Sequence, residues 1–64
     1  MIIINGNELD VSGKTVSQYL REANYTTARV AVEINGDIVP KSEYDEVVLN
    51  DGDTVEIVSF VGGG

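Results

Sequence analysis

At residues 54–64 the chain reads Thr54-Val55-Glu56-Ile57-Val58-Ser59-Phe60-Val61-Gly62-Gly63-Gly64, and this stretch decides the fold. Its first eight residues are rich in β-branched side chains, which predicts the longest strand of the protein, with Val55 and Ile57 facing inward. The pattern then stops at three glycines, which have no Cβ and cannot hold a core together or build a pocket. We therefore predict a last strand that runs into a tail made of backbone alone.

A β-hairpin is predicted at the other end of the sequence, over residues 1–11. Ile2-Ile3-Ile4 is a continuous β-branched run, typical of a strand that is covered on both faces or lies centrally in a sheet. Asn5-Gly6 is a strong two-residue hairpin signal. The alternation after this turn predicts that Leu9 and Val11 face inward.

One short amphipathic helix is expected next. Thr15 and Gln18 have the spacing of a capping box, in which both side chains bond exposed amides at a helix start. The helix is expected to end near Asn24, and its apolar face to consist of Val16, Tyr19, Leu20 and Ala23. That face either covers the sheet or binds a partner, and we expect the former because the sheet would otherwise lack a second layer.

Two more strands are predicted in the middle of the chain. Residues 30–34 alternate, with the valines and the isoleucine on one face, and then reach a second turn signal at Asn35-Gly36. Ile38-Val39 resumes the pattern until Pro40, which cannot donate to a sheet ladder and so predicts a short edge strand.

The connecting segments carry weaker signals. Residues 24–29 show no clear pattern, and residues 41–50 are expected to form a crossing loop with one helical turn. Asp51 and Asp53 flank Gly52 and form either a tight turn or a carboxylate site, of which we expect the turn. The acidic side chains at 43, 45 and 46 are expected to form a solvated face.

The order hairpin, helix, strands and last strand predicts an α+β fold. A right-handed connection after the hairpin places the last strand beside and parallel to the first, in the middle of the sheet. This is the β-grasp arrangement, a mixed sheet of four to five strands with one packed helix. We assign residues 1–61 to this domain and residues 62–64 to a flexible glycine tail that leaves a rigid body in a fixed direction.

Composition excludes most small-enzyme chemistry. The 64 residues form one domain, near the lower size limit for folding without staples, so a deep catalytic cleft is not expected. The sequence has no cysteine and no histidine, and we expect neither a bound metal nor a bound cofactor. Eleven acidic residues against four basic ones give a net charge of −7. We therefore expect no nucleic acid or membrane partner, a basic protein surface as partner, and a cytoplasmic location.

With these features together, the sequence resembles the ThiS family of sulfur carriers in thiamine biosynthesis, which are ubiquitin-like β-grasp proteins. The resemblance spans essentially the whole chain, although the helix is short and Gly62 lengthens the glycine tail by one residue. The stretches that carry it are Asn5-Gly6, Thr15-Val16, residues 30–40, residues 49–58 and Gly63-Gly64.

The resemblance implies that this chain is a protein co-substrate and not an enzyme. An E1-like adenylating enzyme (ThiF-like) would use ATP to form an acyl-adenylate on Gly64, and a sulfur donor such as a cysteine desulfurase would supply a persulfide that displaces AMP. The resulting thiocarboxylate on Gly64 would give its sulfur to thiazole synthase (ThiG-like). The absence of cysteine fits this role, because the chain has no thiol that holds sulfur elsewhere.

The tail would act by threading a narrow channel in a partner. Val61 to Gly64, fully extended, spans about 13 Å, and side chains in place of Gly63 or Gly64 would obstruct such a channel. Gly62 belongs to the same tail. We expect the docking surface around Phe60, Val58 and Val61. Phe60 either docks or closes the core, and for Val58 a core position is the stronger expectation.

Other functions remain open at this point. The small subunit of molybdopterin synthase uses the same tail chemistry, although the shorter length here favours the thiamine carrier. A β-grasp binding module with an inert tail, or a tail that is a leftover linker, would also fit the glycines.

Overall fold

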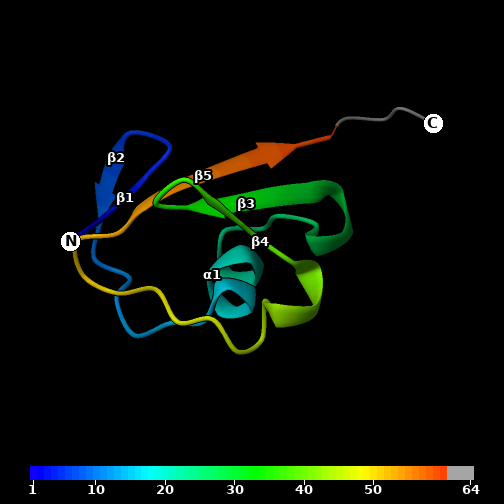
Figure 1. The fold of residues 1–64 in the computed structure, drawn as a ribbon, viewed down its shortest axis with the longest axis horizontal. Coiled ribbons are helices and arrows are strands. Elements are labelled where there is room, and N and C mark those ends of the chain that lie inside the picture. The colour runs from blue at the N-terminus through cyan, green and yellow to red at the C-terminus, as the bar shows by residue number, and fades with distance from the viewer. Residues whose placement is uncertain (61–64) are drawn as a thin grey trace.

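The computed structural model describes residues 1–60, and the elements in this range follow the predicted order (Figure 1). Two short strands come first and are followed by one helix and three further strands. Two 3₁₀ turns are also present. η1, Thr27–Arg29, lies in the segment without a clear sequence pattern, and η2, Lys41–Glu43, lies in the loop for which one helical turn was expected. The strands and the helix are β1 Ile2–Ile4, β2 Asn7–Leu9, α1 Val16–Glu22, β3 Val30–Ile34, β4 Asp37–Val39 and β5 Thr54–Ser59.

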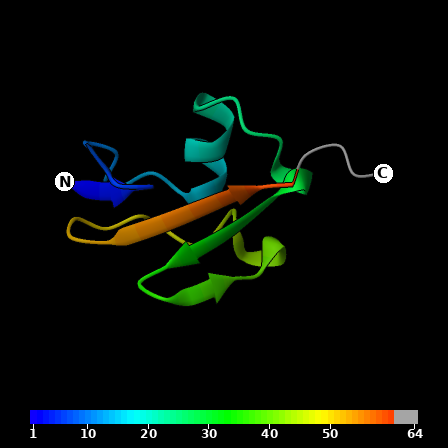
Figure 2. The same cartoon turned by 90° about the horizontal axis from the view of Figure 1, so that it is seen from above.

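All five strands join one mixed sheet in the order β2-β1-β5-β3-β4. β1 and β5 pair in parallel, whereas the other three neighbouring pairs are antiparallel. The one α-helix of residues 1–60, α1, covers one face of this sheet, as the two views at right angles show (Figures 1 and 2). The predicted arrangement is therefore confirmed, with the last strand central and parallel to the first.

Both Asn-Gly pairs form hairpin turns. Asn5 and Gly6 have φ values of 50° and 85°, and Asn35 and Gly36 have 52° and 89°. Positive φ at both central residues is the property of the turn whose twist matches the two flanking strands, and asparagine and glycine adopt it most easily. These two local signals therefore fix the register of β1 with β2 and of β3 with β4.

The capping box at the start of α1 is confirmed. The Gln18 amide donates to the Thr15 hydroxyl at 3.1 Å, and the Thr15 amide donates to the Gln18 side chain at 2.8 Å. The helix ends at Glu22, and Asn24 takes a left-handed conformation with φ of 64°. The inclusion of Ala23 in the buried face was wrong, because the helix stops before it and leaves it exposed.

The core lies between α1 and the covered face of the sheet. Val16 and Leu20 of the helix pack on the inward side chains of the strands, and Tyr44 and Leu49 of the crossing loop close the core from the side. The inward strand residues are Ile2, Ile4, Val30, Val32, Val39, Val55 and Ile57. No helix within residues 1–60 is long and apolar enough to cross a membrane.

The opposite face of the sheet is open. Ile3 on β1 is 38% exposed, although its neighbours Ile2 and Ile4 are buried. Of the two explanations for the triple isoleucine, central position in the sheet is correct and coverage of both faces is not. Only one layer of helix is present in this part of the chain, so alternate side chains of every strand face outward.

Candidate functional site

The candidate site is the far end of β5, because this strand leads into the glycine tail. β3 lies along one side of β5 over five residue pairs, from Val30 with Ser59 to Ile34 with Val55. On the other side β1 pairs over only two residues, Ile3 with Thr54 and Ile4 with Val55. The strand is thus held by the sheet along most of its length but unequally on its two sides.

The side chain of Asn5 extends the contact between β1 and β5 beyond the last paired residues, Ile4 and Val55. Its side-chain amide donates to the Ile57 carbonyl oxygen at 3.1 Å, and its side-chain oxygen accepts from the Ile57 amide at 2.8 Å. The Asn5 side chain thus makes the two hydrogen bonds that a further residue of β1 would make, because the chain turns away from β5 at this point. Sequence reasoning assigned Asn5 to the turn alone, because nothing local indicates a contact with a residue 52 positions later.

The end of β5 is also fixed on the β3 side. The Phe60 amide donates to the Arg29 carbonyl oxygen at 2.7 Å, one residue beyond the end of β5. Beside it, the Lys41 ammonium donates to the Val30 carbonyl oxygen at 2.7 Å. The expected continuation of the strand to residue 61 is corrected to an end at Ser59, although Phe60 keeps one ladder-like bond.

Val58 and Phe60 stand side by side on the open face of the sheet. They are 55% and 58% exposed, and they alternate with the inward Val55 and Ile57. The expectation that Val58 is a core residue was wrong, and the same holds for the alternative in which Phe60 closes the core. Both errors have one cause, namely that residues of β5 at even positions face away from α1.

The remaining site residues of the sequence prediction are Val61, Gly62, Gly63 and Gly64, and they lie outside the described residues. Their proposed role as a tail, and the domain boundary after residue 61, therefore stay predictions. What the structure does describe is the place from which they follow, directly after Phe60.

Charged side chains of both signs lie near this end. Glu33 on β3 and Glu56 on β5 are directly paired across the open face, next to Val58. Two like charges opposite each other are unfavourable within a sheet, so a basic group of a partner placed over them would be favoured. Arg29 lies at the end of η1, beside Phe60.

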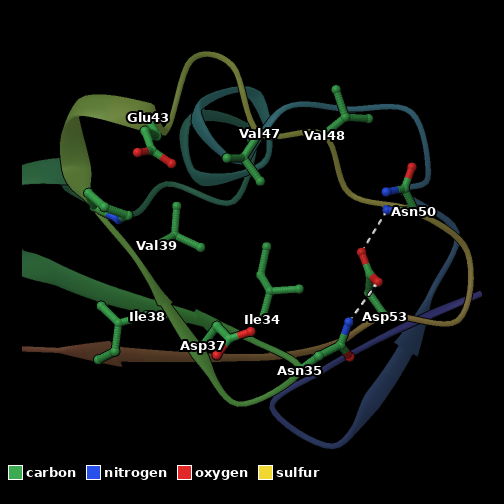
Figure 3. A pocket seen from close by; sticks show the side chains of 11 residues that line it. Ile34, Asn35, Asp37, Ile38, Val39, Glu43, Val47, Val48, Asn50 and Asp53 are labelled. Carbon is green, nitrogen blue, oxygen red and sulfur yellow. Dashed lines mark hydrogen bonds between the residues drawn. The ribbon is translucent and has the colours of Figure 1, made fainter.

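An open hollow of about 330 Å³ lies between the β3–β4 hairpin and the crossing loop of residues 43–53 (Figure 3). Asp53 on its rim accepts from the Asn35 side chain at 3.0 Å and from the Asn50 amide at 2.8 Å. Asp51 pairs with the terminal amine of Met1. Asp53 therefore stabilises the turn, as expected, whereas Asp51 links it to the start of the chain. Within residues 1–60 no group of three or more acidic side chains is arranged to hold a metal ion.

A five-strand mixed sheet with one helix and a central last strand defines a ubiquitin-like β-grasp protein. The model of the ThiS family matches residues 2–64, and the chain belongs to this family.

Individual relatives agree with this membership. The sulfur carrier protein ThiS of Bacillus subtilis (strain 168) is 41% identical over 68 residues, which cover all of both chains. The crystal structure of a thiamine biosynthesis protein (ThiS) from Geobacter metallireducens superposes with a TM-score of 0.78 at 33% identity, covering 98% of this chain and 97% of that one.

A third relative is a longer protein. The thiazole synthase of Paramagnetospirillum magneticum (strain ATCC 700264 / AMB-1) is 50% identical over 64 residues, covering 98% of this chain. This chain spans only 20% of the length of that enzyme. A ThiS-like segment thus occurs there within a polypeptide named for thiazole synthesis.

Proposed function

We propose that this protein is a sulfur carrier of thiamine biosynthesis and that the carboxyl group of Gly64 carries the sulfur as a thiocarboxylate. The observation that carries the proposal is the central strand β5 of a ThiS-family chain, which is held on both sides as far as Ile57 and leads within a few residues to three glycines. The chain is a protein substrate of other enzymes and not itself a catalyst.

The chemistry begins with activation of a poor electrophile. A terminal carboxyl group has a reference pKa of about 3.3 to 3.7, so at neutral pH it is an anion that resists nucleophiles. An adenylating enzyme would join this carboxylate to the α-phosphate of ATP and release pyrophosphate. The terminal sulfur of a protein persulfide would then attack the acyl carbon and expel AMP. Cleavage of the resulting acyl disulfide by a thiol would leave the thiocarboxylate on Gly64.

Docking of the folded body would precede threading of the tail. Ordering the four residues 61–64 costs on the order of 4 to 8 kcal/mol, which contacts made elsewhere must offset. The open face at Val58 and Phe60 offers exposed apolar area for this purpose, directly before the tail. The acidic balance of the chain favours an enzyme with a basic docking surface.

The proposed partners differ in their support. Thiazole synthase is supported by the relative in which a ThiS-like segment and this enzyme name occur in one protein. The E1-like adenylating enzyme and the cysteine desulfurase are proposed from the family resemblance, and the need to activate the carboxylate of Gly64 agrees with them. The thiamine names of the relatives favour this pathway over the small subunit of molybdopterin synthase. The cytoplasmic location stays a prediction from the sequence.

The test is the intact mass of the protein after incubation with ATP, an E1-like adenylating enzyme, a cysteine desulfurase and cysteine. We expect a gain equal to replacing one oxygen by one sulfur, localised to Gly64 by fragmentation. Gly64→Val is the matched variant, since it should fold as the parent does but receive no sulfur. An unchanged mass with an enzyme set that modifies another ThiS protein would favour the binding module with an inert tail.

A further inference from the structure

The backbone of β5 has one unpaired position on its hairpin side. Antiparallel pairing makes alternate residues of a strand bond to opposite neighbours. The Thr54 carbonyl and the Phe60 amide bond to the β3 side, whereas the Val55 carbonyl and both backbone groups of Ile57 bond to Asn5 on the β1 side. By this alternation the amide and carbonyl of Ser59 face the β1 side as well.

Nothing among residues 1–60 pairs with Ser59 on that side. The β1–β5 ladder ends at Val55, and the side chain of Asn5 reaches only as far as Ile57. The hairpin then turns back at Asn5 and Gly6, while β5 continues past it (Figure 1). Ser59 is an exposed residue, and within residues 1–60 its N–H and C=O have no hydrogen-bond partner on this side.

This edge lacks the features that normally protect a sheet edge. Exposed edges are usually protected by charged side chains or proline, which discourage pairing with other chains. The outer strand β4 begins at Asp37 and is followed by Pro40, and β2 carries Glu8. By contrast, residues 58–64 contain no charged side chain and no proline.

We propose that thiazole synthase adds an extended segment to the sheet at Ser59, in the place where β1 would continue. The segment would accept from the Ser59 amide and donate to the Ser59 carbonyl, so that the chain after Phe60 enters the enzyme as part of a paired strand. This inference rests on the proposed function, since it concerns how the acceptor of the sulfur grips the carrier. The thiazole synthase of Paramagnetospirillum magneticum contains a ThiS-like segment, and this favours thiazole synthase over the adenylating enzyme as the partner that pairs with Ser59.

The pairing solves a positioning problem. The side chains of Val58 and Phe60 contact a partner from the open face only, and such contacts leave rotation of the following backbone undetermined. Two backbone hydrogen bonds at Ser59 fix its direction in the plane of the sheet, since strand addition obtains affinity from main-chain groups. Gly64 then lies five residues from a fixed point.

Amide hydrogen exchange of the labelled protein tests the pairing directly. In the protein alone, the Ser59 amide should exchange faster than the amides of Ile57 and Phe60, which already donate hydrogen bonds. Addition of thiazole synthase should slow exchange at Ser59 at least tenfold. Unchanged exchange at Ser59 in a complex that shifts the Val58 and Phe60 signals would overturn the pairing and leave the proposed function intact.

Two variants give a second readout. Ser59→Pro removes an amide that the sheet does not use, whereas Ser59→Ala keeps it and changes the side chain. We expect Ser59→Pro to bind thiazole synthase about tenfold more weakly than Ser59→Ala, the loss expected for one backbone hydrogen bond. Equal affinities of folded variants would overturn the pairing, and if Ser59→Pro does not fold, the exchange experiment decides.

Absence of any binding to thiazole synthase would overturn the pairing together with this partner assignment. The carrier role itself would still be decided by the mass gain at Gly64, which requires neither thiazole synthase nor an intact Ser59 edge. The two failures are therefore distinguishable.

Discussion

At the scale of single residues, Asn5 connects the first turn of the chain to its last strand. It combines a left-handed backbone, with φ of 50°, and two side-chain bonds to the backbone of Ile57. Glycine would satisfy the first requirement and not the second. The residue that secures the hairpin therefore also holds the strand that leads to the tail.

We expect Asn5→Gly to lower the free energy of unfolding by about 1 to 3 kcal/mol, because both Ile57 groups lose their partner. Urea unfolding followed by circular dichroism measures this change. Asn5→Asp is the matched variant, since a carboxylate still accepts from the Ile57 amide but cannot donate to the carbonyl. It should be intermediate, and a stability of Asn5→Gly equal to that of the parent would show that the contact contributes nothing.

At the scale of elements, α1 is short and depends on its start. Its seven residues are too few to be stable alone in water, so packing of Val16 and Leu20 and the capping box must maintain it. The helix is also the only covering layer of the sheet in the described chain. A weakened helix start should therefore affect the whole fold and not only its own first turn.

Thr15→Ala removes the hydroxyl that accepts from the Gln18 amide and should destabilise the protein by about 0.5 to 2 kcal/mol. Thr15→Ser keeps an accepting hydroxyl and should retain most of the stability. Thermal unfolding of the three proteins gives the comparison. Equal losses in both variants would indicate that the methyl group of Thr15, and not its hydroxyl, provides the stabilisation.

The elements that the sequence predicts well are those with local causes. The Asn-Gly turns and the Thr15 capping box each depend on residues within four positions, and all of them are confirmed. The role of Asn5 toward Ile57 depends on a contact between distant parts of the chain and was not predictable. Val55 and Val58 are the same residue type on the same strand. Val55 is buried and Val58 is exposed because the helix covers only the face of the sheet to which Val55 points.

At the scale of the whole molecule, charge and apolar contact are expected to act at different stages of docking. The net charge of −7 acts over distance, whereas Val58 and Phe60 act only on contact. Raising the ionic strength from about 0.01 M to about 1 M shortens the Debye length from about 30 Å to about 3 Å. The association rate with the adenylating enzyme, measured by stopped flow, should therefore fall steeply, with a smaller change in dissociation rate. A salt-independent association rate would remove charge steering from the proposal.

The apolar contact itself is separable from folding, because the open face contains a natural control. Ile38 on β4 is 69% exposed and faces the same side as Val58 and Phe60, but it lies on the outer strand, paired with Glu33. Replacing any of these three side chains by serine should leave the free energy of unfolding within about 0.5 kcal/mol of that of the parent, as expected of exposed positions.

Phe60→Ser and Val58→Ser should each slow transfer of sulfur to Gly64 by tenfold or more at limiting carrier concentration, while Ile38→Ser should behave as the parent. The rate of the mass gain, followed over carrier concentration, measures this effect. Equal effects of all three substitutions would mean that the whole open face docks, and no effect of Phe60→Ser would place the docking surface elsewhere on the molecule.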